Sequence, residues 1–180
     1  PGTRILEGGC GRGDKVYTLT HHGYDAYGVD YAPDTVELIR RYAPELKVSL
    51  GDVRRLEFED GYFDGYWSLG VIEHFWDGYD PILREMHRVL KPGGYAFVTF
   101  PAMSSLRKLK ARLGRYPLWR EGGTTKGEFY QFVLDPPSVA RRFEAAGFTL
   151  METRFHDGFL GLTQESRTFD SLLGRAWGSM

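Results

Sequence analysis

Four glycines occupy six consecutive positions, 8–13, in the stretch ILEGGCGRG near the start of the chain. They surround the single cysteine, Cys10, and they follow an acid, Glu7. Glycine carries an entropic cost, so this concentration indicates a backbone that turns sharply and lets a ligand come close. Because Glu7 would repel a pyrophosphate, the loop favours a ligand with positive charge, such as the amino group of an amino acid.

Two more acids follow the next two apolar segments. Asp30 ends YGVD and could accept both hydroxyls of a ribose. Asp52 follows KVSLG and could accept from an adenine amino group, while the N–H of Val53 faces a ring nitrogen. Each acid alone could be a turn or capping residue. Together with Glu7 they favour a shared ligand with adenine, ribose and a cationic end, which is S-adenosylmethionine.

Short apolar runs alternate with helical patterns along the chain. Strands are predicted at residues 4–9, 25–31, 47–53, 63–72, 93–101 and 148–156. Helices are predicted at 14–22, 35–43, 80–90 and 135–147, with Asp34 and Asp135 as N-terminal caps. The tail at 166–180 is expected to hold a short helix. This alternation predicts an α/β fold, a doubly wound and mostly parallel sheet with helices on both faces.

The composition excludes several classes of protein. The 180 residues suit one domain, and a net charge of −1 gives no general attraction to nucleic acid or anionic membranes. One cysteine suits a reducing, cytoplasmic location. No apolar run approaches the roughly 18 residues of a membrane span, and no signal peptide or metal site is indicated. The chain starts almost directly on a strand, so we expect residues upstream of it.

The chain resembles the class I S-adenosylmethionine-dependent methyltransferases, in the small-molecule type 11 group that includes ubiquinone-biosynthesis-like enzymes. The resemblance lies in ILEGGCGRG, YGVDYAPD, LGDVRRLEFEDGYFDGYWSLGVIEHF and REMHRVLKPGGYAFVTFP, and it covers about residues 4–101. It implies a Rossmann-like sheet of six to seven strands, the last of them antiparallel. A clear seventh strand and the helices that usually precede the first strand are not evident.

The resemblance also implies the cofactor, S-adenosylmethionine, and the residues that contact it. Its methionine end would lie against the glycine loop and the end of the fourth strand, its ribose against the second strand and its adenine against the third. The residues at the methionine end are Glu7, Gly8, Gly9, Cys10, Gly11, Leu69 and Gly70. Those at the ribose are Asp30 and Tyr31, and those at the adenine are Asp52 and Val53. Cys10 is expected to be a small residue that fits the loop and not a nucleophile.

His74, in GVIEHFWDGYD, follows the fourth strand and is the candidate general base for a hydroxyl acceptor. The pair EH is common at this position in the family across varied chemistries, so a structural role stays open. Glu73 is expected to support the fold or the loop. Trp76 and Tyr79 could stack on a substrate or close the core.

Residues 103–128 form a basic insertion with seven Lys or Arg residues against Glu121 and Glu128. Leu106, Leu109 and Leu113 share one helical face, so a lid over the acceptor is one interpretation. Its charge could attract a phosphorylated or lipid-linked acceptor, and a merely solvated helix face is the other interpretation. The later DPPS, at 135–138, resembles the motif of nucleic-acid amine methyltransferases, but it precedes a helix and lacks the aromatic that would stack on a base.

The predicted function is methyl transfer to a small-molecule acceptor, at oxygen, by in-line displacement. The alternatives are a non-catalytic binding module with the same fold and a methyltransferase that acts on a macromolecule. A dehydrogenase is disfavoured by the glycine spacing and by LKPGG. Nucleic acid is disfavoured because no strongly basic surface is evident. The sequence leaves the oligomeric state open.

Overall fold

The computed structural model describes residues 2–115 and 129–156. The chain divides into two compact units. The first, Pro1–Met103 with Trp119–Thr149, holds the sheet and every predicted cofactor residue. The second, Ser104–Leu118 with Leu150–Met180, holds helix α4 (Ser105–Arg112). The expectation of a single domain over 1–180 stays a prediction.

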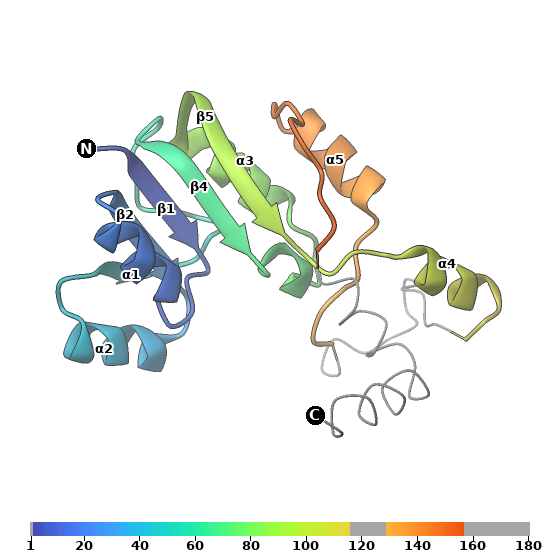
Figure 1. Cartoon of the computed structure of the whole chain (residues 1–180), viewed down its shortest axis with the longest axis horizontal. Helices are drawn as coiled ribbons and strands as arrows, with labels where there is room; N and C mark the ends of the chain where they lie inside the picture. Colours follow the sequence, from blue (N-terminus) through green and yellow to red (C-terminus); the bar gives the residue numbers. More distant parts are fainter. Residues whose placement is uncertain (1, 116–128, 157–180) are drawn as a thin grey trace, which may run out of the picture. The chain divides into compact units, whose positions relative to one another are not determined.

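The first unit is built on a five-stranded sheet in the order β3-β2-β1-β4-β5 (Figure 1). All four neighbouring pairs are parallel. The strands are β1 (Arg4–Gly8), β2 (Asp25–Asp30), β3 (Lys47–Leu50), β4 (Phe63–Leu69) and β5 (Leu90–Thr99). The chain runs outward from β1 to β3 and then returns to β4, on the other side of β1. Ligands of such sheets bind beyond the carboxyl ends of the strands at this reversal.

Helices cover both faces of the sheet, which confirms the doubly wound α/β arrangement. They are α1 (Asp14–His21), α2 (Pro33–Tyr42), α3 (Asp80–Val89) and α5 (Pro136–Ala145). Ile5 of β1 packs in the core that contains Val16 of α1 and Val36 of α2. Its neighbour Leu6 packs in the other core, with side chains of α3 and α5. Successive strand residues point to opposite faces, so one strand supplies both cores.

The predicted number of six to seven strands is wrong for the described residues, where the sheet has five. Residues 148–156, predicted as the sixth strand, form no strand. In this segment Met151 and Phe155 are 76% and 73% exposed, so these apolar side chains are not packed against a sheet. A strand depends on packing against a neighbour more than on its own propensity. The predicted helix at 166–180 lies outside the described residues.

Of the two predicted N-terminal caps, one is wrong and one is confirmed. Helix α2 begins at Pro33 with Ala32 as its N-cap, so Asp34 lies in the first turn and is not the cap. The fixed φ of proline suits the first helical position, and an acid in the first turn still favours the helix dipole. Asp135 does hold the N-cap position of α5, without a side-chain capping bond, and Gly147 follows its end.

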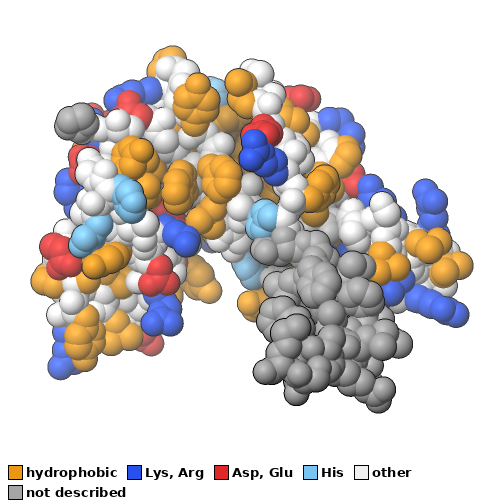
Figure 2. Space-filling view, in the orientation of Figure 1, with side chains coloured by type: hydrophobic (Ala, Val, Ile, Leu, Met, Phe, Trp, Pro, Cys, Tyr) orange, Lys and Arg blue, Asp and Glu red, His pale blue; other side chains and the backbone are white. Residues whose placement is uncertain are grey.

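The sheet carries exposed aromatic side chains on β5. Tyr95 and Phe97 are 70% and 57% exposed, and the Phe97 ring lies 6.0 Å from that of Trp67 on β4. Figure 2 shows hydrophobic side chains gathered over the strands on the viewed face. Among the described residues, no helix has the length and apolar character to cross a bilayer.

Candidate cofactor and active site

The glycine loop begins where β1 ends and folds over the end of β2. The N–H groups of Gly9 and Cys10 both donate to the Val29 carbonyl, at 2.8 and 3.0 Å. Gly9, Gly11 and Gly13 have φ values of 76°, 50° and 77°, in the left-handed region that glycine adopts without strain. The loop then leads into α1, with Gly13 as its N-cap.

Three of the glycines meet different surroundings. A Cβ at Gly8 would collide with the Tyr66 hydroxyl, and a Cβ at Gly9 would lie 2.6 Å from Val71 Cγ2. A Cβ at Gly11 would meet no described residue within 4 Å. Gly8 and Gly9 are therefore required by the packing of β4 and the loop after it. Gly11 instead borders open space, into which a ligand can come close to the backbone.

Glu7 is a buried acid at the foot of the loop. Glu7 is only 4% exposed, and its Oε2 atom has no hydrogen-bond partner in the part of the chain that the structure describes. Burial raises its pKa to about 7, and a backbone hydrogen bond from Val16 and the charge of Lys15 oppose this shift. An orphaned buried carboxyl oxygen fits a cationic ligand group, which would pair with it and restore its charge. The residues present therefore fit the amino end of S-adenosylmethionine.

Asp30 also lies at the loop, buried at 6% exposure. One carboxylate oxygen accepts the N–H of Gly11 at 2.7 Å, and the other accepts the N–H of Ala32 at 3.0 Å. The acid predicted to hold a ribose thus also fastens the glycine loop to the end of β2. Tyr31, beside it, is 81% exposed.

Asp52 follows β3, the next strand of the sheet. Its carboxylate forms a two-pronged ion pair with Arg54, with Nη2 2.6 Å from Oδ2, and accepts the Arg54 N–H at 2.8 Å. The bonds from Arg54 hold the pKa of Asp52 below its ordinary value. Val53 is buried. The sequence did not predict the pairing with Arg54, which engages the oxygens expected to receive an adenine amino group.

Three further residues were predicted to contact the cofactor: Cys10, Leu69 and Gly70. Cys10 is buried, and burial, assisted by the charges of Asp30 and Glu7, raises its pKa to about 12. Its thiol therefore keeps its proton and is a poor nucleophile. Leu69 ends β4, and the N–H of Gly70 donates to the Thr99 carbonyl of β5 at 3.0 Å.

His74 lies in the short 3-10 helix η1 (Ile72–His74) that follows β4. His74 is exposed, whereas its neighbour Glu73 is only 2% exposed, and the Oε2 atom of Glu73 has no hydrogen-bond partner among residues 2–115 and 129–156. Burial raises the pKa of Glu73. The exposed His74 and the buried Glu73 thus lie side by side in the same turn.

Residues 129–134, which we term the strap, contact this turn and were missed in the sequence. The Phe132 N–H donates to the Glu73 carbonyl at 2.9 Å, and His74 Nδ1 lies 2.8 Å from the Tyr130 carbonyl oxygen. The Trp76 ring stacks near Phe132, with centroids 5.9 Å apart. The available signal for an extended segment was a short apolar run, in which Gln131 is the only polar residue.

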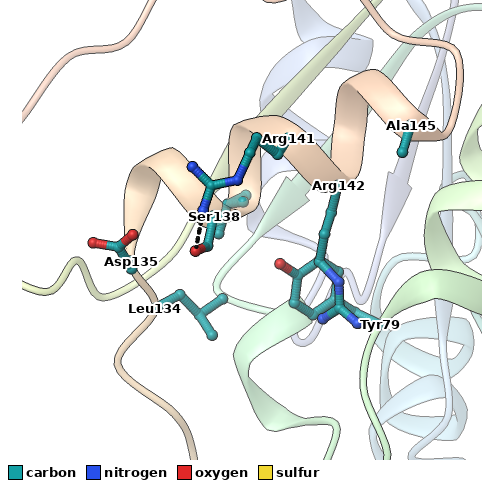
Figure 3. Close-up of a pocket in the computed structure, with 8 residues that line it drawn as sticks. Tyr79, Leu134, Asp135, Ser138, Arg141, Arg142 and Ala145 are labelled. Atoms are coloured by element: carbon teal, nitrogen blue, oxygen red, sulfur yellow. Dashed lines mark hydrogen bonds between the residues drawn. The ribbon is translucent and has the colours of Figure 1, made fainter.

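A separate open pocket of about 480 Å³ lies between the start of α3 and α5 (Figure 3). Its lining includes Tyr79, Leu134, Ser138, Arg141 and Arg142, and none of the predicted cofactor residues. In Figure 3 the Arg142 guanidinium lies over Tyr79, 4.8 Å from the ring centroid. The pocket is therefore separate from the predicted cofactor site. The described residues hold no cluster of possible metal ligands.

The sheet is parallel, and its strand order reverses between β1 and β4. A glycine loop follows β1, and an acid lies at or just after the carboxyl end of each of β1, β2 and β3. These features define a Rossmann-like cofactor-binding domain. The comparisons with known proteins identify the family. The Methyltransferase domain family matches residues 6–98, and the chain belongs to it. It is an S-adenosylmethionine-dependent methyltransferase domain, as the resemblance predicted.

Three curated relatives show the range of proteins to which the chain is similar. A probable S-adenosylmethionine-dependent methyltransferase from Mycolicibacterium smegmatis is 28% identical over 84% of this chain and 54% of its own length. A malonyl-[acyl-carrier protein] O-methyltransferase from Herminiimonas arsenicoxydans is 34% identical, over 63% and 43%. A probable tRNA methyltransferase 9B from Bos taurus is 38% identical, over 57% and 22%. The chain thus spans about half or less of the length of these relatives.

A solved structure of a S-adenosylmethionine-dependent methyltransferase from Methanosarcina mazei shares the fold. Its TM-score is 0.69 at 23% identity, and the match covers 84% of this chain and 82% of that one.

Proposed function

We propose that this domain methylates a small-molecule acceptor at oxygen, with S-adenosylmethionine held on the glycine loop. The proposal is carried by two features of the glycine loop and the strand before it. Among the described residues, the buried Oε2 atom of Glu7 has no hydrogen-bond partner, and a Cβ at Gly11 would meet nothing within 4 Å. This combination suits a ligand with a cationic end that lies close to the backbone.

The roles follow the order of the strands. Glu7, Gly8, Gly9, Cys10 and Gly11 hold the methionine end, and Leu69 and Gly70 line its other side. Asp30 and Tyr31 contact the ribose, while Asp52 and Val53 contact the adenine. Since Arg54 already binds the Asp52 carboxylate, Asp52 shares its oxygens between the ion pair and the adenine.

When bound, S-adenosylmethionine supplies an electrophilic methyl group on a sulfonium. The chain's own contribution is to position the acceptor, which can be worth up to about 7–11 kcal/mol in favourable cases. His74 accepts the proton of the acceptor hydroxyl, which leaves the oxygen more nucleophilic. Glu73 is buried, so we assign it no role in proton transfer.

A small acceptor fits this chain better than tRNA. The net charge of the chain, −1, supplies none of the general attraction to phosphates on which nucleic-acid binding depends. The malonyl-methylating relative also acts at an oxygen atom. The basic segment at 103–128 gives a local attraction, which suits an acceptor with a phosphate or a lipid tail. The single cysteine fits a reducing, cytoplasmic compartment.

Two measurements test the proposal. Calorimetry should show binding of S-adenosylhomocysteine and none of NAD, and the reverse result contradicts the cofactor assignment. Release of S-adenosylhomocysteine is then followed over a panel of phenols, carboxylic acids, phosphorylated and lipid-linked alcohols, amines and tRNA. Turnover of tRNA alone contradicts the small acceptor, and cofactor binding without any turnover favours the non-catalytic module.

In the same assay, His74→Asn separates chemistry from structure. The Asn side-chain N–H₂ can still donate to the Tyr130 carbonyl, but it has no basic nitrogen. We expect the rate to fall about 10²-fold or more, in line with the loss of a general base, while S-adenosylhomocysteine binds as before. A rate close to wild type makes His74 a structural residue.

A further inference from the structure

The strap is fixed on both sides of the residue that contacts His74. Toward its end, the Leu134 N–H donates to the Pro101 carbonyl at 2.9 Å, and the Leu134 carbonyl accepts from Met103 at 2.8 Å. At its start, the Phe129 ring lies 5.0 Å from that of Trp76, which also stacks near Phe132. Tyr130 therefore sits in a segment that hydrogen bonds and ring contacts hold against the turn after β4.

The contact between Tyr130 and His74 fixes where the imidazole carries its hydrogen. A backbone carbonyl can only accept, so His74 Nδ1, at 2.8 Å from the Tyr130 oxygen, must be the donor. A neutral imidazole carries one hydrogen, and Nε2 is then left with its lone pair. The two rings also meet edge to face, with centroids 5.1 Å apart at 74°, which restricts how the imidazole can turn.

We infer that Tyr130 is a positioning residue that makes Nε2 the basic nitrogen of His74. The inference rests on the proposed role of His74 as the base. When a hydroxyl acceptor gives its proton to Nε2, the ring becomes an imidazolium with both nitrogens protonated. The Tyr130 carbonyl still accepts from Nδ1–H in that state, and a hydrogen bond from a charged donor is stronger than one from a neutral donor. Without this contact, the hydrogen could sit on Nε2 and block the base.

The tautomer can be measured without knowing the acceptor. In the full chain labelled with ¹⁵N-histidine, long-range ¹H–¹⁵N spectra at about pH 8.5, where imidazoles are neutral, show which ring nitrogen carries the hydrogen. His21 and His22 serve as internal references, since their Nδ1 atoms lie 2.9 and 2.8 Å from the carbonyls of Tyr17 and Thr18 within α1. We expect His74 to show a roughly five- to tenfold excess of the Nδ1–H form, equivalent to about 1–1.4 kcal/mol. A His74 that is mainly Nε2–H, as in a free side chain, overturns the inference.

Variants of the strap test its role directly. Phe132→Pro removes the N–H that bonds to Glu73 and the ring beside Trp76, so His74 should move toward the Nε2–H form while His21 and His22 stay unchanged. Gln131→Ala, at an exposed strap position, is the matched control and should leave all three unchanged. Tyr130→Gly keeps the carbonyl and should largely keep the tautomer. A folded Phe132→Pro chain with an unchanged His74 contradicts the inference, and the wild-type spectrum decides it if that variant does not fold.

Calorimetry on the same samples separates this inference from the proposed function. A wild-type chain that binds S-adenosylhomocysteine but has His74 as Nε2–H contradicts the role of Tyr130 and leaves the cofactor assignment intact. A chain with His74 as Nδ1–H that binds no S-adenosylhomocysteine contradicts the cofactor assignment and leaves the Tyr130 contact intact.

Discussion

The Asp30 carboxylate accepts the Gly11 N–H at 2.7 Å, so the acid that ends β2 holds the middle of the glycine loop. Its other oxygen accepts the Ala32 N–H at 3.0 Å, at the start of α2. One side chain therefore sets the shape of the loop and carries the lone pairs proposed to receive the ribose. Loss of Asp30 should then affect both stability and binding.

Asp30→Ala should lower the affinity for S-adenosylhomocysteine at least tenfold, because hydrogen bonds to charged groups are worth about 1.5–3 kcal/mol each. It should also lower the melting temperature, since the N–H groups of Gly11 and Ala32 lose their acceptor. Asp30→Asn keeps one carbonyl oxygen and should have an intermediate effect. Calorimetry and thermal unfolding measure the two effects. Unchanged affinity in Asp30→Ala would show that Asp30 only shapes the turn.

Gly9 and Gly11 form a matched pair for the loop. Both have left-handed φ values, but a Cβ at Gly9 would lie 2.6 Å from Val71 Cγ2, whereas a Cβ at Gly11 would meet nothing within 4 Å. Left-handed backbone costs a residue with a Cβ about 1–2 kcal/mol. Gly9→Ala should therefore destabilise the domain well beyond this amount.

Gly11→Ala should instead lower the stability by only about 1–2 kcal/mol. It should still weaken the binding of S-adenosylhomocysteine at least tenfold, because its Cβ enters the space proposed for the ligand. Chemical denaturation and calorimetry provide the comparison. If Gly11→Ala binds as tightly as wild type, the ligand does not approach the loop at this position.

Glu7 should make both stability and binding depend on pH. Its pKa in the folded chain, about 7, lies above the ordinary 4.5, so the folded state holds the proton more tightly. The protonated Glu7 therefore stabilises the folded state fully below about pH 4.5, and this stabilisation is lost as the pH rises through 7. Glu7→Gln should therefore stabilise the cofactor-free chain by up to about 3 kcal/mol at pH 8 and have little effect at pH 4.5.

Cofactor binding should respond to Glu7 with the opposite sign. A cationic ligand lowers the pKa of Glu7, so binding releases a proton, and affinity should rise with pH until about 7. Titration of S-adenosylmethionine in buffers of different ionisation enthalpy counts the released proton. In Glu7→Gln the affinity should be weaker at pH 8 and the proton release absent. Proton release that persists in this variant would assign it to another group.

The basic segment should act on the acceptor and not on the cofactor. Reversing Arg107, Lys108 and Arg112 to Glu should raise the KM for an anionic acceptor found in the panel, and added salt should reduce the effect because exposed charges are screened over about 8–10 Å. S-adenosylhomocysteine affinity should stay within about twofold. Neutral acceptors are the control. If the triple variant has a normal KM for the anionic acceptor at low salt, the basic face of α4 is only solvated and does not act on the acceptor.

Local patterns were sufficient for much of the architecture. Parallel strands joined by helices are specified by apolar periodicity and by glycine and proline at the element ends, and these signals lie within a few residues of one another. The glycine loop could be read in the same way, because its left-handed backbone at Gly9, Gly11 and Gly13 demands a residue type that is visible in the sequence. The acids Glu7, Asp30 and Asp52 followed from the rule that strand ends meet at one edge.

Long-range contacts decided what local patterns could not. The segment 148–156 was predicted as a strand, but a strand needs a neighbour, and the sequence does not show which partner is present. Even the local pairing of Asp52 with Arg54, two residues away, depends on side-chain geometry that spacing alone does not define. His74 could be proposed as a base from its place after β4, whereas its donor nitrogen is fixed by Tyr130, which lies 56 residues away in the sequence. The sequence by itself determined the residue types that a cofactor site requires, because backbone strain and charge are properties of single positions. Only the tertiary structure decided which of these groups are already engaged, because hydrogen bonds join atoms that the fold brings together.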